Sequence, residues 1–452
     1  MHANKMASKQ IKKLIWSMGI PMVFSMVLQA LYNVVDTIFV INMGEEGIKA
    51  NLALTYVFPV QIFMIAVGVG TGIGINSLLS RVLGNKDDVA SSKIVGNGIF
   101  IGIVLYLIFL IFGLFGSKWF LSIQTNDIEI IDMGSKYLFI ICVLSLGSLG
   151  YTIYERFLQA SGRTMHSTIA QILGAITNII LDYIFIYPCN MGIEGAAYAT
   201  IIGQFVSLIA AMIFHYVFNK EIKNNIKYLK PDLKIIGQIY KIGWSAMLMQ
   251  ALLSINMFVM IKIFSINNTY GDLINGTYGI YYKIQQIALF SCFGLSNTII
   301  SLLAFNIGLK DNNRIKECIK WGIIDTIAVA VTITILFEAL ATPIANLFAL
   351  ASVGDNKEAI INLTTSAIRI ASIGYVFMGI SLAIQGILQA YRKAITPLII
   401  SLLRLIILLI PFALIFINLD NALTLIWLSF PIAEFLTFII SIFILKRTIK
   451  LN

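Results

Sequence analysis

Twelve long apolar runs constrain this 452-residue chain more than any other feature of its sequence. Each run approaches or exceeds the ~20 predominantly apolar residues that an α-helix needs to cross a bilayer. Charged residues make up only 12% of the chain, whereas about 25% is typical of soluble domains. We therefore predict an all-α polytopic membrane protein with twelve transmembrane helices. The predicted spans are 14–41, 52–80, 94–116, 134–156, 165–187, 193–218, 235–263, 276–307, 318–350, 361–390, 395–417 and 422–445.

The net charge of +10 reflects membrane topology rather than nucleic-acid binding. If loops alternate across the membrane from an inside N-terminus, 24 of the 32 basic residues fall in cytoplasmic segments. This asymmetry is the positive-inside rule. It predicts a multi-pass protein of the cell (plasma or inner) membrane with both termini cytoplasmic. The first run is longer than the ~7–15-residue core of a signal peptide, so we predict that it is the first transmembrane helix.

The second half of the chain repeats the first. The segment Ser77–Asp87 returns as Ser301–Asp311 at an offset of 224, and Leu158–Ala160 returns as Leu388–Ala390 at an offset of 230. The order and nearly constant spacing of these matches indicate a tandem duplication. Since six crossings are an even number, both copies enter the membrane in the same direction. We predict two six-helix lobes related by a pseudo-twofold axis along the membrane normal. The predicted parts are an N-terminal lobe (1–218), a cytoplasmic linker (219–234) and a C-terminal lobe (235–452).

Two consecutive apolar runs carry polar stripes. In the first, Gln171, Asn178 and Asp182 stand at i, i+7 and i+11, which places them on one helix face. In the second, Thr200 and Gln204 are four positions apart and also share a face. A carboxylate within a transmembrane span is costly and by default marks an ion or substrate path. We therefore predict a polar site on these two helices.

The first run carries a similar stripe. Pro21 removes a backbone donor there and favours a bend, so we predict a helix hinge. The polar residues beyond it share one face and are candidates for the same cavity: Gln29, Tyr32, Asn33 and Asp36. Two carboxylates in one low-dielectric cavity repel, so at least one would hold a proton or share a bound cation. Asp36 and Asp182 are therefore predicted to bind or release a proton or cation in response to an ion gradient. The alternative is that each only hydrogen-bonds a neighbouring helix.

Several further charged residues fall inside the predicted spans. Glu155 stands beside Arg156, and either an interfacial ion pair or a place in the cavity fits this position. Lys283 and Glu434 lie deep enough to be cavity candidates. Arg404 is nearer a predicted helix end, and we expect its side chain to snorkel to the interface.

The chain lacks the sequence signatures of several enzyme classes. It contains no GxxxxGK[ST], HExxH or GxSxG motif, and its four cysteines show no pairing pattern. We expect no enzymatic activity, no cofactor and no metal beyond a coupling ion. The expected partners are small organic substrates and membrane lipid, with no nucleic acid and no required protein partner.

Several segments together carry a family resemblance. They are Pro21 with VVDTIFV (34–40), SRVLGNKD (80–87), LQASGR (158–163), NIILDYIFI with MGIEGAAYATIIGQ (within 178–204) and LQAYRKAITPLIISLLRLIILLIP (388–411). With these segments the chain resembles the multidrug and toxic compound extrusion (MATE) family of cation-coupled efflux transporters. The resemblance extends over nearly the whole chain. Its pattern identifies the family and not the substrate.

The resemblance implies two six-helix lobes around a V-shaped cavity, with drug export driven by inward movement of Na⁺ or H⁺. It also implies a first-lobe cation site, to which four positions correspond: Asp36, Asn178, Asp182 and Thr200. Pro21 corresponds to the proline at which the first helix bends, and Glu155 stands where related sequences often have Asn. Lys262 and Arg369 occupy helices in which some members carry acidic residues, which argues against a second cation site in the C-terminal lobe.

Two other functions are compatible with the sequence. A flippase for lipid-linked oligosaccharide or a related lipid could share this architecture, but it is expected to need a more basic cavity for its diphosphate. A receptor or channel would bind or conduct without an opposing ion gradient. The predicted function is a secondary antiporter that exports lipophilic, often cationic compounds in exchange for Na⁺ or H⁺.

Overall fold

The computed structural model describes residues 5–41, 45–222, 224, 226–267, 271–349 and 357–449. Within these ranges all regular secondary structure is helical. In chain order the helices are α1 (Lys5–Ser8), α2 (Ile11–Ile41), α3 (Glu45–Gly84), α4 (Asp88–Ser122), α5 (Ile128–Val143), α6 (Leu146–Ala160), α7 (Thr164–Ile186), α8 (Gly192–Phe218), η1 (Ile226–Leu229), α9 (Leu233–Phe264), α10 (Gly271–Leu309), α11 (Asn312–Ala349), α12 (Lys357–Ser372), α13 (Tyr375–Ala390), α14 (Ile395–Leu402), η2 (Leu403–Ile407), α15 (Leu409–Phe416), α16 (Ala422–Leu425), η3 (Ile426–Leu428) and α17 (Ser429–Thr448).

The number of membrane crossings agrees with the prediction. Ten stretches of helix in the described ranges are long and apolar enough to cross a bilayer, and two bent helix pairs bring the number of spans up to twelve. The bent pairs are α5 with α6, at 43°, and α12 with α13, at 48°. The sequence predicted each pair as one uninterrupted run, so the two bends are a feature that it missed.

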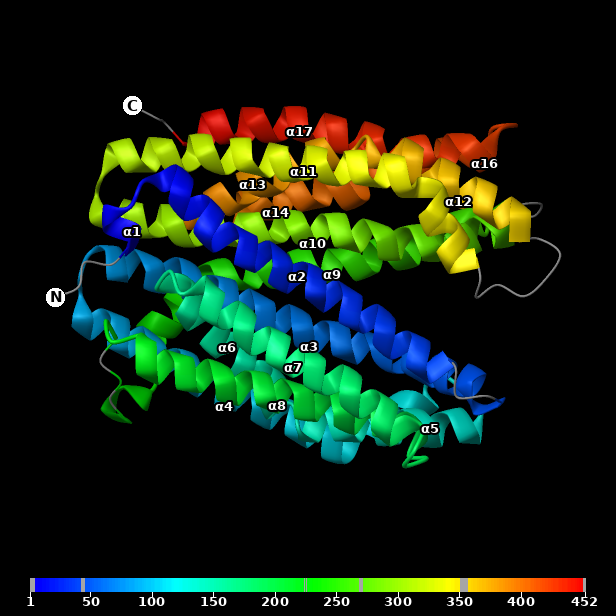
Figure 1. Ribbon diagram of the computed structural model, residues 1–452, viewed down its shortest axis with the longest axis horizontal. Helices are drawn as coiled ribbons and strands as arrows, with labels where there is room; N and C mark the ends of the chain where they lie inside the picture. Colours follow the sequence, from blue (N-terminus) through cyan, green and yellow to red (C-terminus); the bar gives the residue numbers. More distant parts are fainter. Residues whose placement is uncertain are drawn as a thin grey trace.

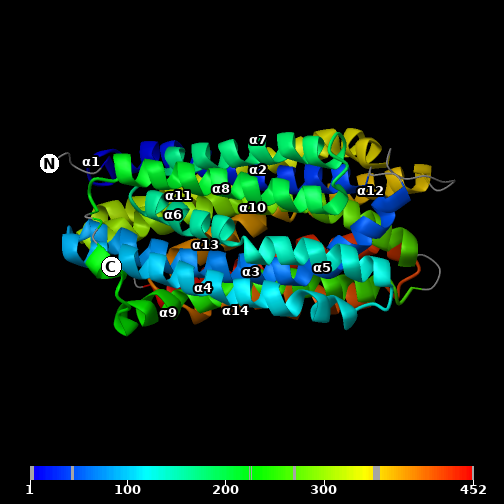
Figure 2. The same cartoon turned by 90° about the horizontal axis from the view of Figure 1, so that it is seen from below.

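The two halves of the chain form two bundles that lie side by side (Figure 1). Helices α3 to α8 make up most of one bundle, α11 to α17 make up most of the other, and α2, α9 and α10 lie where they meet. Helix α1 and the last turns of α17 lie at the same end of the molecule, together with the ends of α3 and α10. The view from below shows the same elongated arrangement of nearly parallel helices (Figure 2).

The duplication seen in the sequence extends to the backbone of the turns. Lys86 and Lys310, which correspond at the offset of 224, both have left-handed conformations, with φ of 56° and 59°. Gly162 and Arg392, which correspond at the offset of 230, also share this conformation, with φ of 79° and 60°. Left-handed backbone is uncommon for residues other than glycine. Its recurrence at matching positions indicates that the two halves repeat in structure as well as in sequence.

Two glycines bring the halves into close contact near the ends of α3 and α10. A Cβ atom on Gly84 would lie 2.1 Å from the Phe305 carbonyl oxygen, and one on Gly308 would lie 2.0 Å from the Arg81 carbonyl oxygen. Any residue larger than glycine would clash with backbone at either position. Gly84 corresponds to Gly308 and Arg81 to Phe305 at the first repeat offset, so the contact has the predicted pseudo-twofold symmetry. We call these four residues the glycine crossing.

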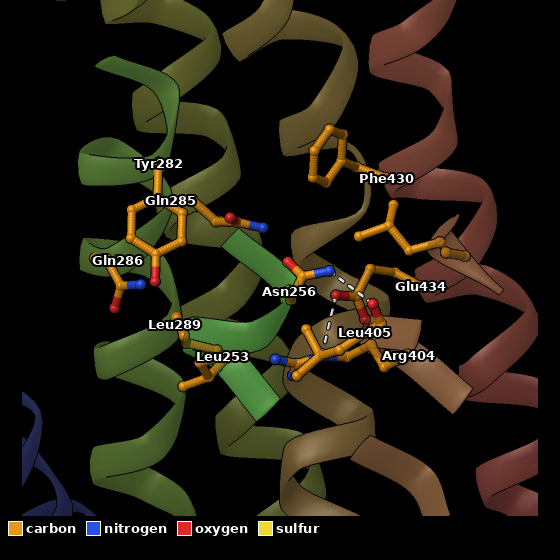
Figure 3. A pocket seen from close by; sticks show the side chains of 12 residues that line it. Leu253, Asn256, Tyr282, Gln285, Gln286, Leu289, Arg404, Leu405, Phe430 and Glu434 are labelled. Atoms are coloured by element: carbon orange, nitrogen blue, oxygen red, sulfur yellow. Dashed lines mark hydrogen bonds and ion pairs between the residues drawn. The ribbon is translucent and has the colours of Figure 1, made fainter. Parts of the chain in front are cut away.

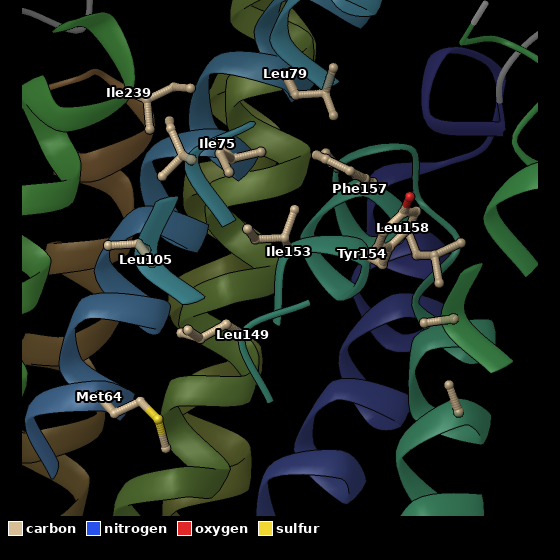
Figure 4. Packing of buried hydrophobic residues seen from close by; sticks show 14 of the residues in the cluster. Met64, Ile75, Leu79, Leu105, Leu149, Ile153, Tyr154, Phe157, Leu158 and Ile239 are labelled. Atoms are coloured by element: carbon tan, nitrogen blue, oxygen red, sulfur yellow. The ribbon is translucent and has the colours of Figure 1, made fainter. Parts of the chain in front are cut away.

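Buried apolar side chains fill each bundle. In the first, Ile75 and Leu79 of α3 pack with Leu105 of α4 and with Ile153 and Phe157 of α6 (Figure 4). The second has its own cluster of buried apolar residues, rich in rings, which includes Phe264, Tyr278, Tyr281, Trp427 and Phe430. The outward faces of the helices are also apolar, and Phe115 is 81% exposed. Such surfaces suit contact with lipid rather than water.

Candidate functional site

The predicted polar site lies between α7 and α8, where glycines allow the two helices to approach closely. A Cβ atom on Gly174 would lie 2.4 Å from the Gly203 carbonyl oxygen, and one on Gly203 would lie 2.7 Å from that of Gly174. One turn further along α7, the Asn178 side-chain amide donates a long hydrogen bond of 3.5 Å to Thr200 Oγ1 of α8. The glycine contact therefore brings together two of the residues predicted from spacing.

The same face of α7 carries the predicted carboxylate. Asp182 is fully buried and Asn178 is 4% exposed, one turn apart on the helix. Both side chains thus lie inside the protein and not on its lipid-facing surface. Gln204, on the face of α8 that carries Thr200, is partly buried, and its Oε1 atom has no hydrogen-bond donor in the part of the chain that the structure describes.

Helix α7 is tied to α2 around the predicted hinge. Helix α2 runs without a break from Ile11 to Ile41 with Pro21 inside it. The Thr168 hydroxyl of α7 donates a 2.8 Å hydrogen bond to the Pro21 carbonyl oxygen. One turn later, the Ser25 hydroxyl of α2 donates to Gln171 Oε1. In this conformation the proline is accommodated within a continuous helix that α7 supports.

These contacts also set the register of α2 against α7. The Tyr187 hydroxyl, just after α7, donates a 3.2 Å hydrogen bond to the Phe39 carbonyl oxygen near the end of α2. Pro21 and Phe39 on α2 thus pair with Thr168 and Tyr187, so the two segments run parallel over almost equal lengths. This register puts the backbone position of Asp36 beside the segment of α7 that contains Asp182.

The remaining polar residues of α2 divide into two groups. Gln29 is partly buried. The side chains of Tyr32, Asn33 and Asp36 lie outside the described part of the structure. Their predicted roles in a cavity or a cation site therefore stay predictions.

Gln171 holds the first-lobe helices together. Its Oε1 atom accepts hydrogen bonds from Ser25 of α2 and from the Tyr151 hydroxyl of α6, the latter at 3.0 Å. The Tyr151 hydroxyl also lies 3.4 Å from the Ser167 carbonyl oxygen of α7. Gln171 thus joins three helices next to the Pro21 turn.

Glu155 lies in a buried hydrogen-bonded group within α6. Its carboxylate accepts a 2.9 Å hydrogen bond from the Gln159 amide and lies 3.7 Å from the Arg156 guanidinium. Arg156 in turn donates a 2.7 Å hydrogen bond to Gln159 Oε1. The ion pair considered from the sequence is present, and it is buried because α6 packs its charged turn against Gly72 of α3.

A second buried polar site lies in the C-terminal half, where the sequence carries only weak signals. Arg404 of η2 is 4% exposed and its Nε atom lies 3.5 Å from Glu434 Oε1 of α17 (Figure 3). The expectation that Arg404 snorkels to the interface is therefore wrong, because Glu434 offers it a buried partner. Lys283 has an exposed side chain and does not line the pocket around this pair, so its cavity role stays a prediction.

The first-lobe site has suitable chemistry for a hard cation or a proton. Oxygen atoms from a carboxylate, an amide and a hydroxyl are the ligand types that such cations prefer. Asp182, Asn178 and Thr200 provide one of each within two helical turns of α7 and the facing turn of α8. Burial makes the charge of a carboxylate expensive there unless a cation or proton compensates for it.

Known proteins of similar sequence are named as multidrug export proteins. The multidrug export protein MepA of Staphylococcus saprophyticus is 24% identical over 388 residues, which cover 85% of this chain and 83% of MepA. MepA of Staphylococcus aureus strain MRSA252 is 26% identical over the same length and shares of the chains.

Solved structures share the fold. A structure of a multidrug resistance MATE family transporter in an outward-facing conformation superposes with a TM-score of 0.92 at 21% identity, over 99% of this chain and 98% of that one. The sequence model of the MatE family matches residues 21–184 and 246–415, which is most of the chain. The match covers both halves, including α2 from Pro21 onward and α7 as far as Ile184. The protein is therefore a member of the MatE (MATE) family of membrane transporters.

Proposed function

We propose that the protein is a secondary antiporter that exports lipophilic, often cationic compounds in exchange for Na⁺ or H⁺. Its membership of the family and its similarity to proteins named as multidrug exporters support this class of substrate. The observation that carries the proposal is the buried face of α7, where Asp182 and Asn178 lie beside α8 and the register brings α2 alongside. The proposed coupling site consists of Asp36, Asn178, Asp182 and Thr200.

We further propose that residues 1–218 and 235–452 move as two lobes joined by a linker at 219–234, with both termini in the cytoplasm. The close packing at the glycine crossing supports a pivot between α3 and α10. Pro21 is the proposed hinge of α2, because the hydrogen bond from Thr168 supports its carbonyl and Ser25 ties the next turn to Gln171. A shift of α7 would therefore be passed to α2 directly.

In the proposed cycle, cation binding at Asp36 and Asp182 lowers the affinity for the exported compound. Linkage requires that the compound lowers the affinity for the cation by the same factor. A membrane potential of 100 mV supplies about 2.3 kcal/mol per inward charge, so one cation per cycle can sustain a gradient of several tens-fold for a neutral compound. For a neutral compound no further energy source is needed; for a monovalent cation exchanged one for one, the concentration gradient of the coupling ion must drive export.

Equilibrium binding to the purified protein in nanodiscs tests this coupling. We expect the affinity for a lipophilic cation such as tetraphenylphosphonium to fall when Na⁺ is added or when the pH is lowered, depending on which ion couples. Asp182→Asn should abolish this dependence while the protein stays folded. Asp325→Asn is the matched control, because Asp325 is a buried carboxylate of α11, which packs mainly on α10, α12 and α13.

The outcomes separate the alternatives. If neither Na⁺ nor pH changes the affinity of the wild-type protein, coupling at this site is refuted. If Asp325→Asn removes the dependence as fully as Asp182→Asn does, the site has been wrongly placed. A lipid flippase would instead bind no lipophilic cation, and loss of the protein would damage envelope synthesis without raising drug sensitivity.

A further inference from the structure

The C-terminal half contains a pocket built around the buried Arg404–Glu434 pair, which we call the second-lobe pocket. Its polar lining comes from Asn256 of α9, Tyr282, Gln285 and Gln286 of α10, Arg404 of η2 and Glu434 of α17 (Figure 3). The cavity that these residues enclose has a volume of about 20 Å³. That volume has room for roughly one or two water molecules, and not for a drug.

The second-lobe pocket lies where the repeat places the Gly174 and Gln204 turns of α7 and α8, next to the candidate cation site. Helix α8 begins at 192 and ends at 218, and the segment from α16 to α17 begins at 422 and ends at 448, so both ends are shifted by the second repeat offset of 230. Helix α7 ends at 186, and α15 ends at 416, at the same offset. Under this correspondence Glu434 matches Gln204, and Arg404 matches Gly174. The charged pair therefore occupies the place of the glycine contact and of the polar stripe on α8.

The backbone differs between the two copies where the arginine replaces the glycine. In the first lobe, Gly174 packs against Gly203 with no room for a side chain. In the second, the helix widens into a π-helical turn at Leu403–Ile407, and the Leu405 carbonyl oxygen accepts a 2.6 Å hydrogen bond from the Asn256 amide. Such turns occur frequently at functional sites. Here the wider turn accompanies a guanidinium that enters the pocket.

The pair is buried and incompletely hydrogen-bonded. Glu434 is 8% exposed and its Oε2 atom has no hydrogen-bond donor within the described ranges; Arg404 Nη1 likewise has no acceptor there. Tyr281, Tyr375 and Cys292 lie close enough to interact with Glu434, and none of these side-chain types supplies a positive charge. Arg404, by contrast, keeps its positive charge at all physiological pH values.

We propose that Arg404 is a built-in cation of the second lobe, which neutralises Glu434 in place of a Na⁺ ion or proton. A buried carboxylate needs a compensating positive charge, and Arg404 supplies this charge permanently. Glu434 then binds no ion from solution, and the coupling ion binds in the first lobe alone. This inference rests on the proposed function for its meaning in transport. The neutralisation of Glu434 by Arg404 can be tested separately.

Counting bound cations tests the proposal. The purified full-length protein in nanodiscs is titrated with radioactive Na⁺, and its proton uptake is measured by potentiometry across pH 5–9. We expect Arg404→Gln to bind one Na⁺ or one proton more per protein than the wild type, because Glu434 loses its partner. The double variant Arg404→Gln/Glu434→Gln should return to the wild-type number, and so should the exchanged pair Arg404→Glu/Glu434→Arg.

Two results would overturn the proposal. One is an Arg404→Gln protein that is folded by size-exclusion chromatography and still binds only the wild-type number of cations. The other is a double variant that binds one cation fewer than the wild type, which would mean that Glu434 binds an ion despite Arg404. The double variant keeps the test decisive if the single variant does not fold. If the proposed antiport itself is wrong, the wild type shows no ion-dependent efflux, but the difference of one cation remains.

Discussion

Replacing Gly308 with alanine should push the two lobes apart at the glycine crossing. The new Cβ atom would lie 2.0 Å from the Arg81 carbonyl oxygen, whereas ordinary contact begins at 3.4 Å. Helices α3 and α10 would have to separate by about 1.4 Å, the difference between these distances. Overpacking against backbone typically costs about 1–3 kcal/mol. That cost corresponds to a roughly 5- to 150-fold lower population of this packing relative to any state in which the crossing is open.

Gly279→Ala is the matched control for this prediction. Gly279 lies in the same helix, and a Cβ atom built there would meet nothing within 4 Å. Both replacements gain the higher helix propensity of alanine, worth about 1 kcal/mol. The difference between the two variants therefore isolates the steric cost at the crossing.

Spin labels on the two exposed turns beside the crossing can report the separation. Cysteines introduced at Asn85 and Asn313 would carry the labels, after Cys189, the exposed one of the four native cysteines, is replaced by serine. Pulsed electron paramagnetic resonance should show a longer distance in Gly308→Ala than in Gly279→Ala. Identical distance distributions in the two variants would refute the reasoning, because the lobes would then tolerate a side chain at the crossing.

Three further predictions concern single contacts. Gly203→Ala would place a Cβ atom 2.9 Å from that of Asn178, so we expect at least tenfold lower cation affinity; unchanged affinity in titrations would contradict the proposed site. Thr168→Val removes the 2.8 Å hydrogen bond to the Pro21 carbonyl, and thermal unfolding should show a loss of about 1 kcal/mol that Thr168→Ser does not show. Arg314→Ala removes the 2.7 and 3.0 Å hydrogen bonds that hold α1 and the residue after it, each worth about 1.5–3 kcal/mol. We therefore expect faster amide hydrogen exchange in α1. Exchange at the wild-type rate would show that these bonds contribute nothing.

The sequence predicted the fold well because the bilayer leaves few alternatives. Every backbone polar group in lipid must be paired within the protein, so apolar runs of sufficient length must be helices. The bends inside the two helix pairs were missed because they depend on packing. At one of them, a Cβ atom on Gly374 would lie 2.9 Å from Pro431 Cα, a contact between segments far apart in the chain that no local pattern reports.

The candidate site was only partly predictable. Helical spacing identified Asn178 and Thr200, because both lie on faces that the glycine contact then brings together. The Arg404–Glu434 pair was missed because its members lie on different helices and neither belongs to a polar stripe. Applying the second repeat offset to Gly174 and Gln204 would have placed both residues in one site.

Ion-coupled efflux from proteoliposomes tests the central claim most directly. Vesicles loaded with a fluorescent organic cation would be given a Na⁺ gradient or a pH gradient separately, with the wild type, Asp36→Asn and Asp182→Asn compared at equal reconstitution. We expect export under one of the two gradients by the wild type, and no gradient-dependent export by either variant. Export that is the same with and without both gradients, or that survives in Asp182→Asn, would contradict the claim.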